Sequence, residues 1–319
     1  MNKFLLAIAL ILLNSVAQAE IIGKADVSLT QINSFGSNPG DLKMYFYAPK
    51  NVVEKAPLVV ILHGCAQSAA EFDDEIGFTK LADENKFYLL LPQQKESNNE
   101  WRCFNWFNQE DITRGKGEAA SIVEMVEFMQ KEFAIDGRRV FILGLSAGAA
   151  MSNAMMANYP EVFSGGALVA GIPFGCAKDG SAAWSCMYGA AYPVPTAQQR
   201  GDFVRAAIGS YNGPLPRVIV VHGSSDEFVS PKNAQFNIDQ WTNVHGIDNV
   251  ADADTKLDNQ QYLEHKKGSQ TVVSFLNIKG QKHGFPVDPK KGCGEAGKFV
   301  LDSGVCAARH ISSFFKILK

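Results

Sequence analysis

The chain has 319 residues, of which 46% are hydrophobic and 20% charged, a composition typical of a folded globular protein. Its 30 basic and 33 acidic residues leave no basic excess to attract nucleic acid, so nucleic-acid binding is not expected. The length suits one large domain or two small ones, and the sequence has no charge block, low-complexity tract or internal repeat.

The N-terminal residues have the organisation of a signal peptide. Lys3 supplies a positive start, Phe4–Leu13 is an apolar run too short to cross a bilayer, and Ala17-Gln18-Ala19 is a small-residue cleavage site. A membrane anchor is the alternative, but no second long apolar run follows, so stable membrane insertion is not expected. We expect cleavage near Ala19 and a secreted or periplasmic protein of residues 20–319, folded as a single domain.

Strands alternate with helices along the remaining chain. Residues 25–32 and 41–47 alternate apolar and polar side chains around turn residues, which predicts an antiparallel hairpin at a sheet edge. Continuous apolar runs predict buried strands at 58–62, 87–91, 139–143, 167–170, 218–221 and 272–276. Helical spacing predicts helices at 68–85, 117–133, 149–156 and 234–244, and an amphipathic closing helix through 311–317.

This alternation predicts an α/β protein with a mainly parallel, doubly wound sheet and helices on both of its faces. Catalytic groups are then expected at the carboxyl ends of the strands. Two stretches depart from the pattern. Residues 171–217, rich in Gly, Ala, Pro and aromatic residues, are interpreted as a cap-like excursion over the site, and residues 248–258 as a polar loop.

The residues Gly144-Leu145-Ser146-Ala147-Gly148 form a G-x-S-x-G pattern between a predicted strand and a predicted helix. That setting is typical of a nucleophile elbow, a sharp turn that holds its serine in a strained backbone conformation. The glycines leave room where a side chain would collide with the neighbours of the turn. The pattern itself is common by chance, so it is the flanking strand and helix that favour Ser146 as a nucleophile.

A serine hydroxyl needs a base to accept its proton and an acid to orient that base. After an elbow of this kind the order along the chain is acid, then histidine. Asp226 follows the strand 218–221 and His283 lies in a loop after the strand 272–276, so we expect them in these roles. Asp226 as a turn residue or helix N-cap is the alternative. The other histidines divide into competing bases at strand ends, His63 and His222, and expected surface groups, His245, His265 and His310.

Two backbone N–H groups are needed to stabilise the tetrahedral intermediate. The amide of Ala147, directly after the nucleophile, is one candidate, and the amide of Cys65, in the loop after the strand 58–62, is the other. Trp106 lies in an aromatic cluster with Trp101, Phe104 and Phe107. This cluster has two possible roles: it packs in the core, or it forms an apolar platform for the substrate.

Six cysteines in an exported chain favour disulfides, and six allow fifteen connectivities. Local loops favour Cys176–Cys186 and Cys293–Cys306, which leaves Cys65–Cys103. That last bond would fix the loop that carries the second amide donor. A zinc site or a reactive thiol is the alternative, but no C-x-x-C pair or neighbouring histidine supports zinc, and no metal is expected.

The motifs LHGCAQ at 62–67, CFNWF at 103–107, RGKGE at 114–118 and GLSAG at 144–148 occur in this order. Together with Asp226 and His283 they give the sequence a resemblance, from about Leu42 to His283, to the esterase family of polyhydroxybutyrate depolymerases. That family is related to feruloyl and acetylxylan esterases. The resemblance implies an α/β-hydrolase fold, a Ser-His-Asp triad and hydrolysis of carboxylic esters without a cofactor.

We therefore expect a serine esterase that forms an acyl-enzyme at Ser146, with poly- or oligo-3-hydroxybutyrate as its ester substrate. A feruloyl or acetylxylan-type carbohydrate esterase is the alternative, because the same triad serves and only the pocket differs. A lipase or peptidase, and a non-catalytic binding protein on a hydrolase fold, are more remote alternatives.

Overall fold

The computed structural model describes residues 20–22, 29–190 and 193–319; the expected signal peptide and residues 25–28 of the expected hairpin lie outside this range. The strands of the main sheet are β1 (Glu20–Ile22), β2 (Leu29–Ile32), β3 (Lys43–Tyr47), β4 (Ala56–Leu62), β5 (Tyr88–Gln93), β6 (Ile135–Leu145), β7 (Gly165–Val169), β8 (Arg217–Gly223), β9 (Ala253–Leu257), β10 (Gln260–Lys267) and β11 (Gln270–Ile278). A second, small sheet pairs β12 (Phe285–Val287) with β13 (Val300–Asp302).

The main sheet has the strand order β1-β2-β3-β5-β4-β6-β7-β8-β11-β10-β9. Its central strands, from β5 to β11 in that order, run parallel. Antiparallel strands extend it at both ends, β1 to β3 beside β5 and β10 with β9 beyond β11. The prediction of a mainly parallel sheet with an N-terminal antiparallel hairpin, formed by β2 and β3, is confirmed.

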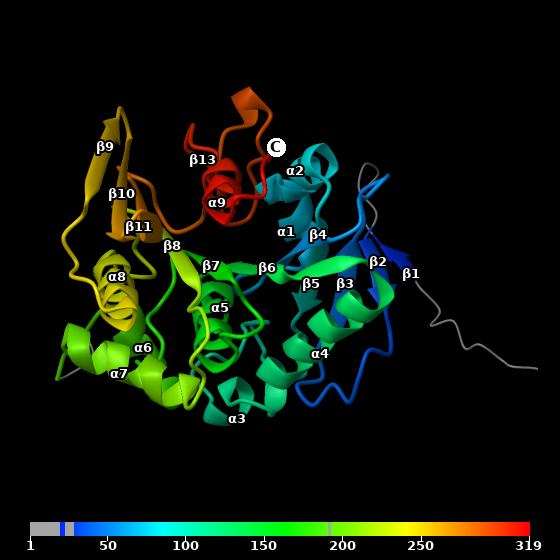
Figure 1. The fold of residues 1–319 in the computed structure, drawn as a ribbon, viewed down its shortest axis with the longest axis horizontal. Coiled ribbons are helices and arrows are strands. Elements are labelled where there is room, and N and C mark those ends of the chain that lie inside the picture. Colours follow the sequence, from blue (N-terminus) through cyan, green and yellow to red (C-terminus); the bar gives the residue numbers. More distant parts are fainter. Residues whose placement is uncertain (1–19, 23–28, 191–192) are drawn as a thin grey trace, which may run out of the picture.

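Helices cover both faces of this sheet (Figure 1). On one side lie α1 (Ala69–Ile76), α2 (Phe78–Asn85) and α9 (Ala307–Phe315). On the other lie α3 (Gln109–Ile112), α4 (Gly117–Glu132), α5 (Ala147–Asn158), α6 (Gly180–Met187), α7 (Ala197–Ile208) and α8 (Lys232–His245). Alternate residues of β4 point to the two sides: Leu58, Val60 and Leu62 join one core, and Val59 and Ile61 join the other. The continuous apolar runs in the sequence therefore reflect strands buried on both faces.

The single helix predicted at 68–85 is two helices, so that prediction was wrong. α1 begins with a capping box between Ser68 and Glu71 and ends at Gly77, whose φ of 78° is left-handed. A Cβ atom on Gly77 would lie 2.7 Å from the backbone nitrogen of Gly294. The chain therefore breaks where a C-terminal segment packs against it, a contact that local helical periodicity does not report.

The polar loop predicted at 248–258 was also wrong in part, because β9 forms within it. β9 pairs antiparallel with β10, which pairs with β11 in turn. Side chains of β9 are largely exposed, so the strand has no apolar face that its sequence could show. The excursion at 171–217 contains α6 and α7, and α7 packs against α8 and α5.

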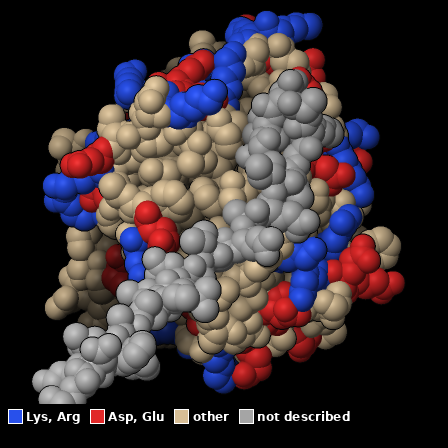
Figure 2. Space-filling model, turned by 90° about the vertical axis from the view of Figure 1, so that its right-hand side faces the viewer, with Lys and Arg blue, Asp and Glu red and all other residues tan. Residues whose placement is uncertain are grey.

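Basic and acidic side chains are interspersed on the face seen in Figure 2, around an area of uncharged residues. Within the described part of the chain, no helix combines the length and the apolar character that crossing a membrane requires. On this face, basic and acidic side chains lie near one another and neither forms a large patch, in keeping with the nearly equal numbers of the two in the sequence.

We predict that Gly77→Ala destabilises the fold more than Gly246→Ala. Both glycines end a helix with a left-handed φ, 78° and 69° respectively, which costs an alanine about 1–2 kcal/mol. Gly246 has open space around its Cα, whereas Gly77 faces the backbone of Gly294, which adds about 1–3 kcal/mol of overlap. Urea unfolding of the two variants measures the difference; equal losses would contradict the packing at Gly77.

Candidate active site

Ser146 occupies the sharp turn between β6 and α5. Its φ of 57° and ψ of −117° lie outside the regions that an ordinary L-residue adopts. The backbone N–H of Ser146 donates to the carbonyl of Val169, 2.9 Å away, which ties the turn to the end of β7. A Cβ atom on Gly144 would lie 2.3 Å from the carbonyl carbon of Gly148, so the turn closes on itself too tightly for any side chain there. The serine is thus held in a strained elbow at the end of a central strand.

The loop after β4 lies directly against this elbow. A Cβ atom on Gly148 would be 2.3 Å from the carbonyl oxygen of Leu62 and 2.5 Å from that of His63. Gly64, the next residue of the loop, approaches the Leu145 side chain. Since Ala147 is the first residue of α5, its N–H has no partner within the helix. The two candidate amide donors, Ala147 and Cys65, therefore belong to segments in contact.

Asp226 and His283 are brought together by the neighbouring parallel strands β8 and β11. His283 Nδ1 lies 2.8 Å from Asp226 Oδ2, and both side chains are buried. The loops that carry them touch: a Cβ atom on Gly223 would lie 2.3 Å from the carbonyl oxygen of Gln281. Asp226 Oδ1 accepts from the backbone N–H groups of Phe228, at 3.0 Å, and Val229, at 2.8 Å. The carboxylate is therefore held from both sides.

His222 is a second histidine on the same carboxylate. Its Nε2 lies 3.3 Å from Asp226 Oδ2 and 2.9 Å from the carbonyl oxygen of Val229. Because a carbonyl can only accept, Nε2 must carry the proton and donate. His222 is 2% exposed and its polar contacts lie on one nitrogen, whereas His283 uses Nδ1 for Asp226 and leaves Nε2 for another group. The sequence did not indicate that His222 shares the carboxylate.

The charge of Asp226 is stabilised despite its burial. Burial by itself raises the pKa of this carboxyl group, but hydrogen bonds from His222 and His283 and from the Val229 N–H outweigh it. The pKa of Asp226 is therefore well below its usual range. An ionised carboxylate fixes the His283 tautomer with its proton on Nδ1 and stabilises the ring when it becomes positively charged.

His63 supports the loop that carries Cys65. Its Nδ1 lies 2.8 Å from the carbonyl oxygen of Gly64, and its Nε2 accepts from the backbone N–H of Gln94 at 3.1 Å. Burial lowers the pKa of His63 to about 4, so the ring is neutral near pH 7. Two histidines expected at the surface, His245 and His265, are in fact buried and contact backbone carbonyls, so that expectation was wrong.

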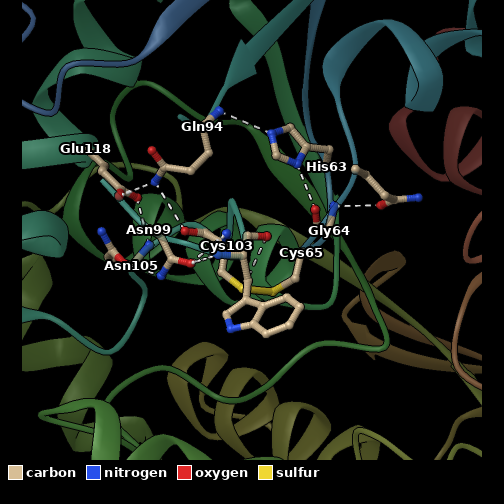
Figure 3. Close-up of a disulfide and its surroundings, with 10 residues drawn as sticks. His63, Gly64, Cys65, Gln94, Asn99, Cys103, Asn105 and Glu118 are labelled. Carbon is tan, nitrogen blue, oxygen red and sulfur yellow. Dashed lines mark hydrogen bonds between the residues drawn. A yellow bond between two sulfur atoms is a disulfide. The ribbon is translucent and has the colours of Figure 1, made fainter. Parts of the chain in front are cut away.

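A buried acid, Glu118, lies beside Gln94 and Asn105 (Figure 3). Glu118 accepts from the side-chain amide of Gln94 and, at 2.9 Å, from the backbone N–H of Asn105. The Gln94 amide also reaches the carbonyl of Cys103 at 3.2 Å. Burial, followed by the nearby charge of Asp111, raises the pKa of Glu118 to about 8. The sequence motif at 114–118 thus contributes a side chain to the support of the site.

The structure pairs all six cysteines, as Cys65–Cys103, Cys176–Cys186 and Cys293–Cys306. The last two are the pairs that short loops favoured, and the first is the pair that they left. The first links the loop after β4 to the segment beside Glu118 (Figure 3), and the backbone N–H of Ala66 adds a 2.6 Å hydrogen bond to the carbonyl of Trp101. Among the described residues, no three His, Cys, Asp or Glu side chains are grouped so as to hold a metal ion.

The aromatic residues around Cys103 divide into buried and exposed groups. Trp106 is 8% exposed and packs edge-on against Phe107, with ring centroids 5.6 Å apart. Trp101 is 67% exposed. On the other side of the site, Phe228 is 50% exposed and lies 5.5 Å from the His283 ring. Trp101 and Phe228 therefore offer more surface to a substrate than Trp106, although no sequence pattern singles out Phe228.

The fold is that of the α/β-hydrolase esterases. The structure is similar to acetyl xylan esterase from Aspergillus awamori, with a TM-score of 0.77 and 24% identity, over 91% of this chain and 100% of that one. It is also similar to an S-formylglutathione hydrolase from Staphylococcus aureus, with a TM-score of 0.54 and 10% identity, over 93% and 99% of the two chains. Likeness at such identities establishes the fold alone.

The chain belongs to the Esterase PHB depolymerase family, whose sequence profile matches residues 42–260. It is 43% identical to poly(3-hydroxyalkanoate) depolymerase C from Paucimonas lemoignei, over 91% of this chain and 70% of that protein. It is 35% identical to feruloyl esterase B from Thermothelomyces thermophilus, over 69% and 76%. The resemblance seen in the motifs is confirmed, and the protein is a carboxylic ester hydrolase of this family.

We predict that Glu118 makes the protein less stable as the pH rises from 7 to 8. Its carboxyl group keeps a proton up to about pH 8 when folded but loses it near pH 4.5 when unfolded. The folded state then binds more protons, and the free energy of unfolding falls by roughly 1 kcal/mol over this pH unit. His63 and His245, whose pKa values burial lowers to about 4, act in the opposite direction, but their effect is complete by pH 7.

Urea unfolding of wild type and Glu118→Gln at pH 7 and pH 8 isolates this effect, because all other groups cancel in the difference. The difference between the two proteins in free energy of unfolding should change by roughly 1 kcal/mol between pH 7 and pH 8. A gap that does not change with pH would show that Glu118 is already ionised at pH 7.

Proposed function

We propose that Ser146, His283 and Asp226 form the catalytic triad of an esterase that acts on poly- or oligo-3-hydroxybutyrate. The proposal of the triad is supported by the 2.8 Å contact between His283 and Asp226, at the same sheet edge as the strained elbow of Ser146. The substrate class rests on the 43% identity to a poly(3-hydroxyalkanoate) depolymerase over 91% of the chain.

In this mechanism Ser146 Oγ attacks the ester carbonyl while His283 Nε2 accepts its proton. The amides of Cys65 and Ala147 donate to the oxyanion of the tetrahedral intermediate. His283 then protonates the leaving alcohol, and water hydrolyses the acyl-enzyme with the same residue as base. Asp226 stays ionised throughout, which its lowered pKa favours.

Substrate contacts are proposed for the aromatic side chains on the two sides of Ser146. Trp101 and Phe228 have the exposed area, whereas Trp106 is 8% exposed and packs against Phe107, so it presents little surface of its own. A feruloyl or acetylxylan-type activity is the second candidate, because the chain is 35% identical to a feruloyl esterase and 33% identical to an acetylxylan esterase from Coprinopsis cinerea.

Export of the protein is proposed from two observations. Residues 1–19 have the pattern of a signal peptide, and three disulfides are typical of proteins that fold in an oxidising compartment. N-terminal sequencing of the protein recovered outside the cytoplasm checks the expected start at Glu20; a retained leader would contradict cleavage at Ala19.

Ser146→Ala is predicted to lower kcat on p-nitrophenyl butyrate by at least about 10³-fold, because the triad acts as a unit. Ser152→Ala is the matched control: this serine lies buried on the same helix and donates to the carbonyl of Gly148 at 2.9 Å. The control should keep kcat within a few-fold of wild type. Full activity of Ser146→Ala would refute the assignment of the nucleophile.

The two histidines on Asp226 are predicted to differ in the same assay. His283→Gln should lose activity by a factor comparable to that of Ser146→Ala, since it removes the base. His222→Gln keeps a donor for the carbonyl of Val229 and should retain activity within about tenfold, a loss of about 1.4 kcal/mol in transition-state stabilisation. The reverse order would make His222 the base.

The substrate is decided by comparing 3-hydroxybutyrate oligomers, methyl ferulate and acetylated xylan as substrates for one enzyme preparation. We expect the highest kcat/KM on the oligomers, because the polyhydroxyalkanoate depolymerase has the higher identity and matches more of this chain. Release of ferulate or acetate with none of the oligomers cleaved would favour the carbohydrate esterase instead.

A further inference from the structure

The segment closed by the Cys293–Cys306 disulfide contacts both the loop after β4 and the His283 ring of the candidate active site. We call residues 293–306 the clasp. Within it, Gly297 and Val300 exchange backbone hydrogen bonds of 2.9 and 3.2 Å and so form a tight turn with Lys298 and Phe299 at its tip. Phe299 has a φ of 59°, a conformation that is costly for an aromatic residue. Strain held in this way calls for a structural reason.

The base of the clasp is attached to the helices on its side of the sheet. The N–H of Glu295 donates to the carbonyl of Glu75 at the end of α1, at 2.8 Å. Lys80 on α2 donates to the carbonyl of Gly292 at 3.1 Å. β13, which lies within the clasp, pairs with β12, and β12 follows His283 by one residue. The clasp is therefore fixed at several points before its tip meets the site.

One contact of the tip is with the loop after β4, through Gln67. The side-chain amide of Gln67 donates to the carbonyl of Lys298 at 2.6 Å, across 231 positions of sequence. Its carbonyl oxygen accepts from the N–H of Gly64 at 2.8 Å. Gln67 is 1% exposed, so water cannot replace either bond without entering the fold.

These bonds hold the residue next to the peptide group that carries the N–H of Cys65. A peptide group is planar, so the direction of the Cys65 N–H is set by the position of the Gly64 carbonyl at its other end. That carbonyl accepts from His63 Nδ1 at 2.8 Å, and Gln67 holds the preceding peptide through the N–H of Gly64. Gln67 thus connects the clasp to the group proposed to bind the oxyanion.

The second contact of the tip is with the proposed base. The Phe299 ring packs edge-on against the His283 ring, with centroids 5.9 Å apart, and against the Phe228 ring at 6.1 Å. The carbonyl of Phe299 accepts from the N–H of Phe285, two residues after His283, at 2.7 Å. The unusual φ of Phe299 lets neighbouring residues serve both contacts: the Lys298 carbonyl faces Gln67 while the Phe299 ring faces His283.

We propose that the clasp positions both halves of the catalytic machinery, with Gln67 as the positioning residue that transmits its hold to the oxyanion-binding loop. This inference rests on the proposed triad and the proposed Cys65 donor. It assigns a role to the C-terminal disulfide, because without that bond the tip loses the closed loop that presents Lys298 and Phe299.

Gln67→Leu tests this positioning role. Leucine is similar in size to glutamine, but it can neither accept from the N–H of Gly64 nor donate to the carbonyl of Lys298. We expect kcat on p-nitrophenyl butyrate to fall by roughly 10- to 100-fold, less than the loss of a whole oxyanion donor. KM should stay within about threefold of wild type. Butylboronic acid becomes a tetrahedral anion that resembles the intermediate when Ser146 Oγ adds to its boron and His283 takes the serine proton. Its affinity should fall by the same factor as kcat/KM.

Gln240→Leu is the matched control. Gln240 is 0% exposed and also bridges backbone groups, accepting from the N–H of Phe174 at 2.9 Å and donating to the carbonyl of Arg200 at 3.0 Å. Its loss should lower the midpoint of thermal unfolding without changing kcat or boronate affinity. A kcat of Gln67→Leu within twofold of wild type, or a fall in kcat without a matching loss of boronate affinity, would overturn the proposal.

A double-mutant cycle tests the involvement of the disulfide. Cys293→Ser with Cys306→Ser should lower kcat, and its effect should not add to that of Gln67→Leu, because both act through one connection. Cys176→Ser with Cys186→Ser, at the other local disulfide, should combine additively with Gln67→Leu. Additive effects in the first cycle would overturn the role of the disulfide; if its serine variant does not fold, the comparison of Gln67→Leu with Gln240→Leu decides.

The outcome is separable from that of the proposed function. If Ser146→Ala is as active as wild type, the triad fails, and a change in Gln67→Leu then has no oxyanion to report on. If Ser146→Ala is inactive while Gln67→Leu matches wild type, the positioning role alone fails. Turnover of a short p-nitrophenyl ester serves both tests whichever natural ester the enzyme prefers.

Discussion

The close approach of two backbones at the end of the central strands is the constraint on which the site depends. The first turn of α5 lies so near the end of β4 that Gly148 has no room for a side chain against the carbonyls of Leu62 and His63. That proximity brings the amide of Ala147, after the proposed nucleophile Ser146, beside the loop that carries Cys65. Donors built into two packed backbones need no rearrangement when charge develops, which is what makes such stabilisation effective.

The proposed acid and base, Asp226 and His283, are held by a second close approach, between the loops after β8 and β11, where Gly223 meets Gln281. Asp226 receives two histidine donors on one oxygen and two backbone donors on the other. A carboxylate with this many donors keeps its charge in a buried place. The same charge that orients His283 therefore also holds the loop together, and the two roles cannot be separated by truncating the residue.

The sequence predicted those parts of the fold that depend on residues close together along the chain. Buried strands show as apolar runs, and the elbow shows as glycines at fixed offsets between a strand and a helix. The break at Gly77, the burial of His265 and the contact between Gln67 and Lys298 arise from segments that meet only in the folded chain. β9 was not predicted for a different reason. Its side chains are largely exposed, so backbone hydrogen bonds to β10 hold it in the sheet and its sequence has no apolar pattern.

The distance along the chain between the halves of the site has a consequence for how the enzyme comes into being. The elbow at Ser146 and the loop at Cys65 belong to the first half of the sequence, whereas His283 and the residue that anchors Gln67, Lys298, come near its end. A ribosome that has not yet reached residue 283 has made the proposed nucleophile but not its proposed base. With these proposed roles, a chain cut off before His283 has no hydrolytic activity.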